Sequence, residues 1–283
     1  KKLNYVRNNV AKGLRESRTM CIGVVTTMWH IRNSHVVRGI LKELNKYGYS
    51  VILCQRGEDR ADNSFLKYYF ENKVDGFLYI GTNIDEISND QKRALVLHEI
   101  PVVTLDCAID RMIPSVDIDY FMGAYNAVKF MSERYNTKKI VAIEIEREMR
   151  QEQEREQGIA KAAYELGIEI EIKKDTMYIG PVNDDQYYGT SMHCSEKIIS
   201  AVDNMSEGDV LVLFWSGMEQ WALKRMWQRG QVFPTIVLAQ GFVAQELYDW
   251  LHYSYLPNNK IGKIMAEMII ARLKGENNIE HKL

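Results

Sequence analysis

Short apolar runs alternate with amphipathic stretches along almost the whole chain, and this alternation is the strongest constraint on its fold. The apolar runs are near-continuous and have strand length, as buried parallel strands do. These expected strands cover residues 21–26, 50–54, 76–80, 101–105, 139–143, 169–172, 210–214 and 235–239. The expected helices cover residues 35–47, 63–72, 90–98, 122–135, 152–166, 188–203, 218–229 and 259–273. The pattern predicts an α/β protein with helices on both faces of parallel sheets.

Composition limits the class of protein further. With 283 residues and 46% hydrophobic content, the chain is long enough for two units with separate cores. No apolar run approaches the roughly 18–20 residues of a membrane span, and the N-terminus has no apolar signal segment. The four cysteines are scattered without a Cys-x-x-Cys pair, which favours free thiols in a reducing compartment. These features predict a soluble cytoplasmic protein without membrane association.

The first eighteen residues are strongly basic. Six of them are Lys or Arg and one is Glu, whereas the whole chain has a net charge of −2. This step in charge suggests an arm that faces nucleic acid on an otherwise acidic body. Val10 and Leu14 stand one turn apart on a short predicted helix, which Gly13 weakens, so a binding partner would be needed to order it. The alternative is a frayed basic terminus.

The segment LNYVRNNVAKGLRESRTMCIG, at residues 3–23, resembles the hinge of the lactose-repressor family of bacterial transcription regulators. Further segments follow in the order and spacing of that family: VRGILKELNKYGYSVILC, VDGFLYIG, IPVVTLD, IPSVDIDYFMGAYNAVKFM, ALKRMWQRG and LPNNKIGKIMAEMIIARLKG. The resemblance implies a type I periplasmic-binding-protein-like fold, in which two α/β/α lobes with parallel sheets are joined by three crossovers. The implied parts are a hinge arm, an N-terminal lobe in two segments and a C-terminal lobe, at residues 1–18, 19–131 with 256–283, and 132–255.

The resemblance also implies how the arm contacts DNA. In this family a leucine of the hinge helix enters the minor groove at the operator centre, and Leu14 occupies the place of that leucine. The implied DNA-binding residues are Asn9, Val10, Ala11, Lys12, Leu14 and Arg15. Arg7 departs from the family, which commonly has proline there. Because the chain begins at Lys1 without a helix-turn-helix headpiece, we interpret it as a regulator that lacks its main DNA-reading domain.

An effector site is implied in the cleft between the lobes, at the carboxyl ends of the strands. Asp119 matches the family aspartate that accepts hydrogen bonds from ligand hydroxyls, and it can also cap the following helix. Arg155 matches the arginine that anchors hydroxyl or carboxylate groups, although a charged residue in this acidic stretch can also belong to a solvated helix face. The complete set of expected ligand contacts is Trp29, His30, Asp119, Gln151, Arg155, Tyr187, Trp215 and Gln240.

The expected cleft departs from the family at several positions. Trp215-Ser216 replaces the usual Asn-Asp pair. Gln240 stands near the place of an aspartate, and Gln151 replaces a serine. With fewer carboxylates beside Arg155, the pattern favours a sugar or an anionic sugar derivative that stacks on aromatic rings. Alternatively, the tryptophans fill the cleft and the protein responds to a protein partner.

No motif for an enzyme is present. The sequence has no Gly-x-Ser-x-Gly elbow, phosphate-binding glycine loop, or histidine pair with metal-ligand spacing. We therefore expect no catalytic residue, no cofactor and no metal.

The hypothesis is a cytoplasmic, homodimeric, DNA-binding transcription regulator, with repression as the commoner sense in this family. Its expected partners are operator DNA, a small-molecule effector and a second copy of the chain, which would dimerise along helices 35–47 and 218–229. The effector would change the angle between the lobes and so the spacing of two hinge helices. The rival hypothesis is a solute-binding protein of a transport system.

Overall fold

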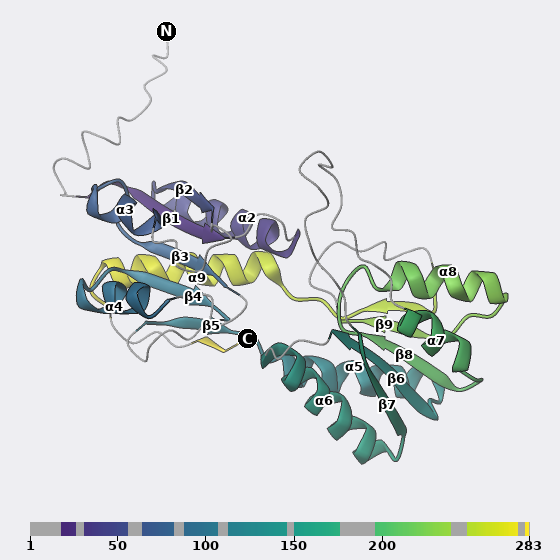
Figure 1. Ribbon diagram of the computed structural model, residues 1–283. Helices are drawn as coiled ribbons and strands as arrows, with labels where there is room; N and C mark the ends of the chain where they lie inside the picture. The colour runs from purple at the N-terminus through teal and green to yellow at the C-terminus, as the bar shows by residue number, and fades with distance from the viewer. Residues whose placement is uncertain are drawn as a thin grey trace, which may run out of the picture. The chain divides into compact units, whose positions relative to one another are not determined.

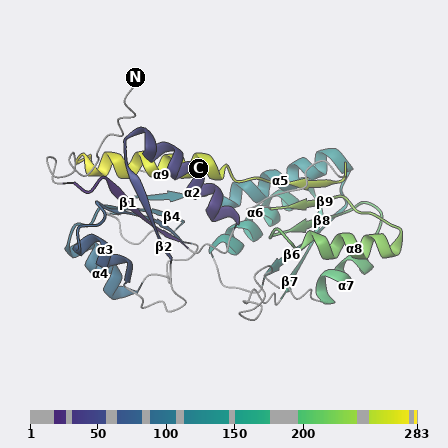
Figure 2. The same cartoon turned by 90° about the horizontal axis from the view of Figure 1, so that it is seen from above.

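The computed structural model describes residues 18–26, 31–55, 64–81, 88–106, 113–145, 150–175, 196–238, 248–276 and 281–282 (Figure 1). The chain divides into two compact units. Unit 1 comprises Lys1–Ile118 with Pro257–Leu283, and unit 2 comprises Asp119–Leu256. Each unit has its own parallel sheet with helices on both faces (Figure 2), so the predicted fold class is confirmed.

Unit 1 contains a six-stranded parallel sheet in the order β11-β5-β4-β3-β1-β2. Its strands are β1 (Cys21–Thr26), β2 (Ser50–Gln55), β3 (Phe77–Ile80), β4 (Val102–Leu105), β5 (Ser115–Asp117) and β11 (His281–Lys282). Its helices are α2 (Ile31–Lys46), α3 (Ser64–Phe70), α4 (Asn89–Leu97) and α9 (Asn258–Leu273). In Figure 2, α2 and α9 lie on one side of the strands and α3 and α4 on the other. Because both faces of the sheet are covered, side chains on opposite faces of β1, such as Ile22 and Val25, are both buried.

Helices α2 and α9 pack unusually closely because glycines lie at their contact. A Cβ atom on Gly39 would overlap the carbonyl oxygen of Asn259, and one on Gly262 would overlap the carbonyl oxygen of Val36. The absence of side chains lets the two backbones approach. The C-terminal helix is therefore an integral part of unit 1.

Unit 2 contains a five-stranded parallel sheet in the order β10-β9-β8-β6-β7. Its strands are β6 (Lys139–Ile145), β7 (Glu169–Asp175), β8 (Asp209–Leu213), β9 (Thr235–Val237) and β10 (Leu251–Tyr253). Its helices are α5 (Tyr120–Tyr135), α6 (Arg150–Leu166), α7 (Glu196–Asn204) and α8 (Glu219–Arg229). One core cluster joins α5 and α6 to the sheet, and a second joins α7 and α8 to it. Successive residues of β8 therefore point in turn into one core and into the other.

All eight expected strands are present, and each expected helix overlaps an observed one. The expected helix over 188–203 is observed from Glu196, and its residues before Glu196 lie outside the described ones. Three short strands were not predicted: β5, β10 and β11. Their sequences, Ser-Val-Asp, Leu-His-Tyr and His-Lys, are too short to form an apolar run, and they are strands because a neighbouring strand supplies hydrogen-bond partners.

The first boundary between the compact units differs from the expected domain boundary. Unit 2 begins at Asp119 and not at the expected residue 132, because helix α5 packs on α6 and on the sheet of unit 2. A Cβ atom on Gly158 of α6 would overlap the carbonyl oxygen of Phe121 in α5, which shows how closely these helices approach. The second boundary falls after Leu256, within one residue of the expected one. The tail from Pro257 belongs to unit 1, and β11 pairs with β5 in its sheet. The expected third crossover, near residue 280, falls outside the described residues.

Within the described residues, no helix combines the length and the apolar character needed to cross a membrane. In the same residues Cys21 and Cys54 are free thiols, as expected, and burial raises the pKa of Cys54 to about 11.

Candidate functional site

The structure describes four of the eight expected ligand contacts, and all four belong to unit 2. Asp119 precedes α5, Gln151 and Arg155 lie in the first turns of α6, and Trp215 follows β8. The other four, Trp29, His30, Tyr187 and Gln240, lie outside the described residues, as do the expected DNA contacts Asn9, Val10, Ala11, Lys12, Leu14 and Arg15.

Arg155 is the centre of the described group. Its side chain is 3% exposed. Its Nη1 atom donates to the carbonyl oxygen of Phe214 at 2.9 Å, and Nη2 donates to that of Leu238 at 3.5 Å. These carbonyls follow β8 and β9 directly, so the arginine ties α6 to the carboxyl ends of two neighbouring strands. A solvated position for Arg155 is therefore excluded.

Aromatic rings also contact this guanidinium. Its carbon lies 5.0 Å from the centroid of the Tyr120 ring and 5.3 Å from that of the Trp215 ring. Both distances are within the range of cation–π attraction. The structure thus brings together Arg155 and Trp215, which are separated by two strands in sequence, and it adds Tyr120.

Glu152 lies one turn before Arg155 on α6 and was not predicted as a site residue. Its Oε2 atom is 3.4 Å from Nη1 of Arg155, and both side chains are 3% exposed. Its Oε1 atom accepts a hydrogen bond of 2.5 Å from the indole N–H of Trp215. Burial raises the pKa of Glu152, while Arg155 and the Trp215 hydrogen bond act in the opposite direction. Glu152 therefore supplies a negative charge beside Arg155, a partner that was not predicted from the sequence.

Asp119 is the N-cap of α5, because its Oδ1 atom accepts from the backbone N–H of Met122 at 3.0 Å. The prediction that Asp119 caps this helix is confirmed. Its role as a ligand contact stays a prediction, and so does that of Gln151, which is only 2% exposed.

Two further carboxylates lie near the carboxyl ends of the strands. Glu144, near the end of β6, is 2% exposed and forms an ion pair of 2.7 Å with Lys174. Glu219, at the start of α8, accepts a hydrogen bond of 2.5 Å from the backbone N–H of Gly217. Burial raises the pKa of both carboxyl groups. It also raises the pKa of Tyr253 to about 12, with a smaller contribution from Glu219.

The described part of the site is thus richer in carboxylates than in cations. Arg155 and Lys174 are each already paired with an acid. No group of three or more His, Cys, Asp or Glu side chains within the described ranges is placed to hold a metal ion. What remains near the strand ends is a group of carboxylates, of which Glu152 contacts Trp215, and carboxylates can accept from a small molecule with donor groups.

The fold and this arrangement agree with the family to which the sequence belongs. A family model described as the periplasmic binding proteins and sugar binding domain of the LacI family matches residues 33–192, and the chain is a member of that family. It is 26% identical over 283 residues to the HTH-type transcriptional repressor PurR of Vibrio cholerae, covering 97% of this chain and 80% of that protein. It is 28% identical over 230 residues to the HTH-type transcriptional regulator RegA of Clostridium saccharobutylicum, covering 77% and 67%.

A solved structure has the same fold. The chain resembles a regulatory protein of the LacI family from Chloroflexus aggregans with a TM-score of 0.76 and 18% sequence identity, over 94% of this chain and 95% of the other. The resemblance to the lactose-repressor family is therefore confirmed, and the chain is a transcription regulator of that family.

Proposed function

We propose that this protein is an effector-controlled, DNA-binding repressor that acts in the cytoplasm, where its DNA target lies. The observation that carries the proposal is the contact of the buried Glu152 and Arg155 with the partly buried Trp215 at the carboxyl ends of the unit 2 strands. Ligands of open parallel sheets bind at this end of the strands. The family description names a sugar-binding domain, which supports a polyhydroxylated effector.

The root of the basic arm supports the DNA-binding part of the proposal. The carboxylate of Asp75 accepts from the backbone N–H groups of Thr19 and Met20, at 2.6 and 3.0 Å. Arg18 donates to the carbonyl oxygen of Leu273 at 2.7 Å. The arm therefore leaves unit 1 from a fixed point beside the end of α9. We propose that residues 9–15 of this arm contact the operator, with Leu14 in the minor groove.

Exposed apolar side chains support a homodimer along α2 and α8. On α2, Leu41 is 47% exposed, and on α8, Trp227 is 81% exposed. Large aromatic side chains at the centre of an interface contribute much of its binding energy.

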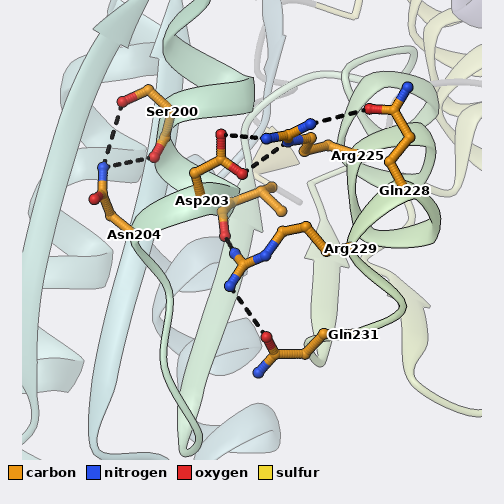
Figure 3. Close-up of polar contacts among 8 residues, drawn as sticks. Ser200, Asp203, Asn204, Arg225, Gln228, Arg229 and Gln231 are labelled. Carbon is orange, nitrogen blue, oxygen red and sulfur yellow. Dashed lines mark hydrogen bonds and ion pairs between the residues drawn. The ribbon is translucent and has the colours of Figure 1, made fainter.

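Polar contacts with α7 add to the apolar core that holds α8 in place (Figure 3). Arg225 forms two hydrogen bonds with the carboxylate of Asp203, at 2.7 and 2.9 Å. One turn later, Arg229 donates to the backbone carbonyl of Val202 and to Gln231. These contacts hold the helix that carries Trp227 in place, which a recognition surface requires.

Operator binding tests the proposal against a solute-binding role. DNA fragments selected by the full-length protein should bind it in fluorescence anisotropy, and Leu14→Ala should weaken the selected sequence far more than random DNA. Equal losses for both DNAs would contradict the minor-groove role of Leu14. A full-length protein that selects no DNA sequence would favour the solute-binding alternative.

The dimer is tested by sedimentation. Trp227→Ala should raise the dimer dissociation constant by about tenfold or more, as expected for an aromatic anchor. Tyr164→Ala is the matched control, because Tyr164 is similarly exposed, at 83%, but lies on α6, outside the proposed interface. Equal dissociation constants for the wild type and Trp227→Ala would remove α8 from the interface.

A further inference from the structure

The guanidinium of Arg155 is largely occupied within unit 2. Two N–H groups of Nη1 are taken by Phe214 and Glu152, and Nη2 donates to Leu238. The two aromatic rings described above contact the same group. An arginine that anchors a phosphate or carboxylate normally presents two parallel N–H groups and an uncompensated positive charge. Arg155 has its charge compensated at 3.4 Å.

The position of Glu152 strengthens this compensation. It lies in the first turn of α6, where the helix dipole attracts negative charge. A ligand anion at this turn would therefore compete with a carboxylate that is built into the protein. Because Glu152 is 2% exposed, solvent does little to screen its repulsion of such a ligand.

We propose that Glu152 is a specificity-determining residue that excludes anionic effectors, so that the effector carries hydroxyl or amino groups, and no phosphate or carboxylate, toward Arg155. This inference rests on the proposed effector site. Each carboxylate oxygen of Glu152 has a second lone pair that can accept from a ligand hydroxyl or ammonium group. A buried negative charge repels a negatively charged ligand, and specific binding sites use such repulsion to reject the wrong ligand. This inference opposes the expectation of an anionic sugar derivative, which stays a prediction that the same experiments test.

Sulfate is the probe for the first experiment, because it tests the anion capacity of Arg155 without knowledge of the effector. Thermal unfolding is followed during sulfate titration of the wild type, Glu152→Gln, Glu154→Gln and the double variant Glu152→Gln/Arg155→Met. Glu154 is the matched control, because it lies on the same helix but pairs with Arg150 in a more exposed position. The double variant measures the general stabilisation by sulfate, which does not need a site.

The melting temperature of Glu152→Gln should rise saturably with sulfate concentration. Its apparent dissociation constant for sulfate should be about tenfold lower than that of the wild type, because one buried repulsive charge is removed. The double variant should lose this response, and Glu154→Gln should behave like the wild type. Equal responses of the wild type and Glu152→Gln, or no saturable response in either, would overturn the inference. If Glu152→Gln does not fold, Glu152→Met replaces it, since Met has a similar length without charge.

A second experiment separates this inference from the proposed function. The wild type is titrated calorimetrically with neutral sugars, the corresponding amino sugars and their phosphate esters. The inference is supported when a neutral or amino sugar binds more tightly than its phosphate ester, and it is overturned by the reverse order. If no compound binds, effector sensing by sugars is contradicted, while the sulfate titration still decides the role of Glu152.

Discussion

Among the described residues, each unit buries an arginine–carboxylate pair near the carboxyl ends of its strands, but the two pairs connect different parts of the chain. In unit 1, Arg32 of α2 pairs with Asp106 after β4 at 2.6 Å, and the side chains are 3% and 2% exposed. In unit 2, Glu152 and Arg155 are neighbours on one helix at 3.4 Å. Asp106 also accepts from the backbone N–H of Ile118 at 3.3 Å, so its carboxylate joins three segments.

The unit 1 pair is structural, whereas the unit 2 pair sets the charge at the proposed effector site. The unit 1 pair holds together elements that are distant in sequence, and its loss should loosen the unit. In unit 2 the contacts of Arg155 with the strand ends do not pass through Glu152, and the long-range contact of Glu152 is the hydrogen bond from Trp215. A neutral acceptor could keep that bond, so the distinctive contribution of this carboxylate is its charge. A buried ion pair is by itself weak evidence of stability, and the two cases show why connectivity matters.

The largest effect is expected for Asp106→Asn. The amide would place a donor against the Arg32 guanidinium and leave that charge buried without its partner, at a cost of roughly 3–5 kcal/mol in unfolding free energy. Hydrogen exchange should show faster amide exchange in unit 1 peptides, with unit 2 unchanged. A cost equal to that of Glu152→Gln would remove the distinction between the pairs.

Glu152→Gln should cost less, about 2 kcal/mol or below. The glutamine oxygen can still accept from Trp215, and Arg155 keeps its two backbone acceptors. The change also removes the penalty for burying a carboxylate, which is the main cause of the raised pKa of Glu152. Urea unfolding monitored by the fluorescence of the unit 2 tryptophans is the measurement. A cost above that of Asp106→Asn would show that the helix pair is structural.

Trp215→Phe should cost about 1 kcal/mol, because it removes one hydrogen bond to a buried carboxylate and keeps an aromatic face toward Arg155. The same urea experiment measures it. In the double variant with Glu152→Gln the two costs should be less than additive, since both remove the same contact. Full additivity would mean that this hydrogen bond contributes nothing.

The smallest effect is a dependence on pH. Burial raises the pKa of Glu152 above its unfolded value, so ionising this carboxyl group costs more in the folded state than in the unfolded chain. Its contribution to stability is fully present below the unfolded pKa and is lost as the pH rises through the folded pKa. The cost of Glu152→Gln should therefore shrink as the pH rises above the ordinary glutamate pKa. A cost that grows with pH in urea titrations would reverse this sign.

Eight of the strands could be predicted from the sequence, because buried parallel strands consist of nearly continuous apolar runs. It could not predict β10 or β11, which depend on a neighbour and not on their own residues. The pair of Arg32 and Asp106 was also out of reach, since 74 positions separate its members. Local patterns contain no information about such a contact.

Glu152 was missed for a different reason. It lies in the run EIEREMRQEQEREQ, whose many charges resemble a solvated helix start. The signal that identifies it is its spacing of three from Arg155, which places both side chains on one face of α6. Once one of them is assigned to the interior, the other is expected there as well. The predictions for Trp29, His30, Tyr187 and Gln240 concern residues outside the described ones.

The anchoring of Thr19 and Met20 by Asp75 has a practical consequence for protein engineering. Because one carboxylate accepts from both backbone amides, Thr19 and Met20 are held firmly against unit 1 at the start of β1. A foreign DNA-reading module spliced in ahead of this clamp would inherit a defined starting direction.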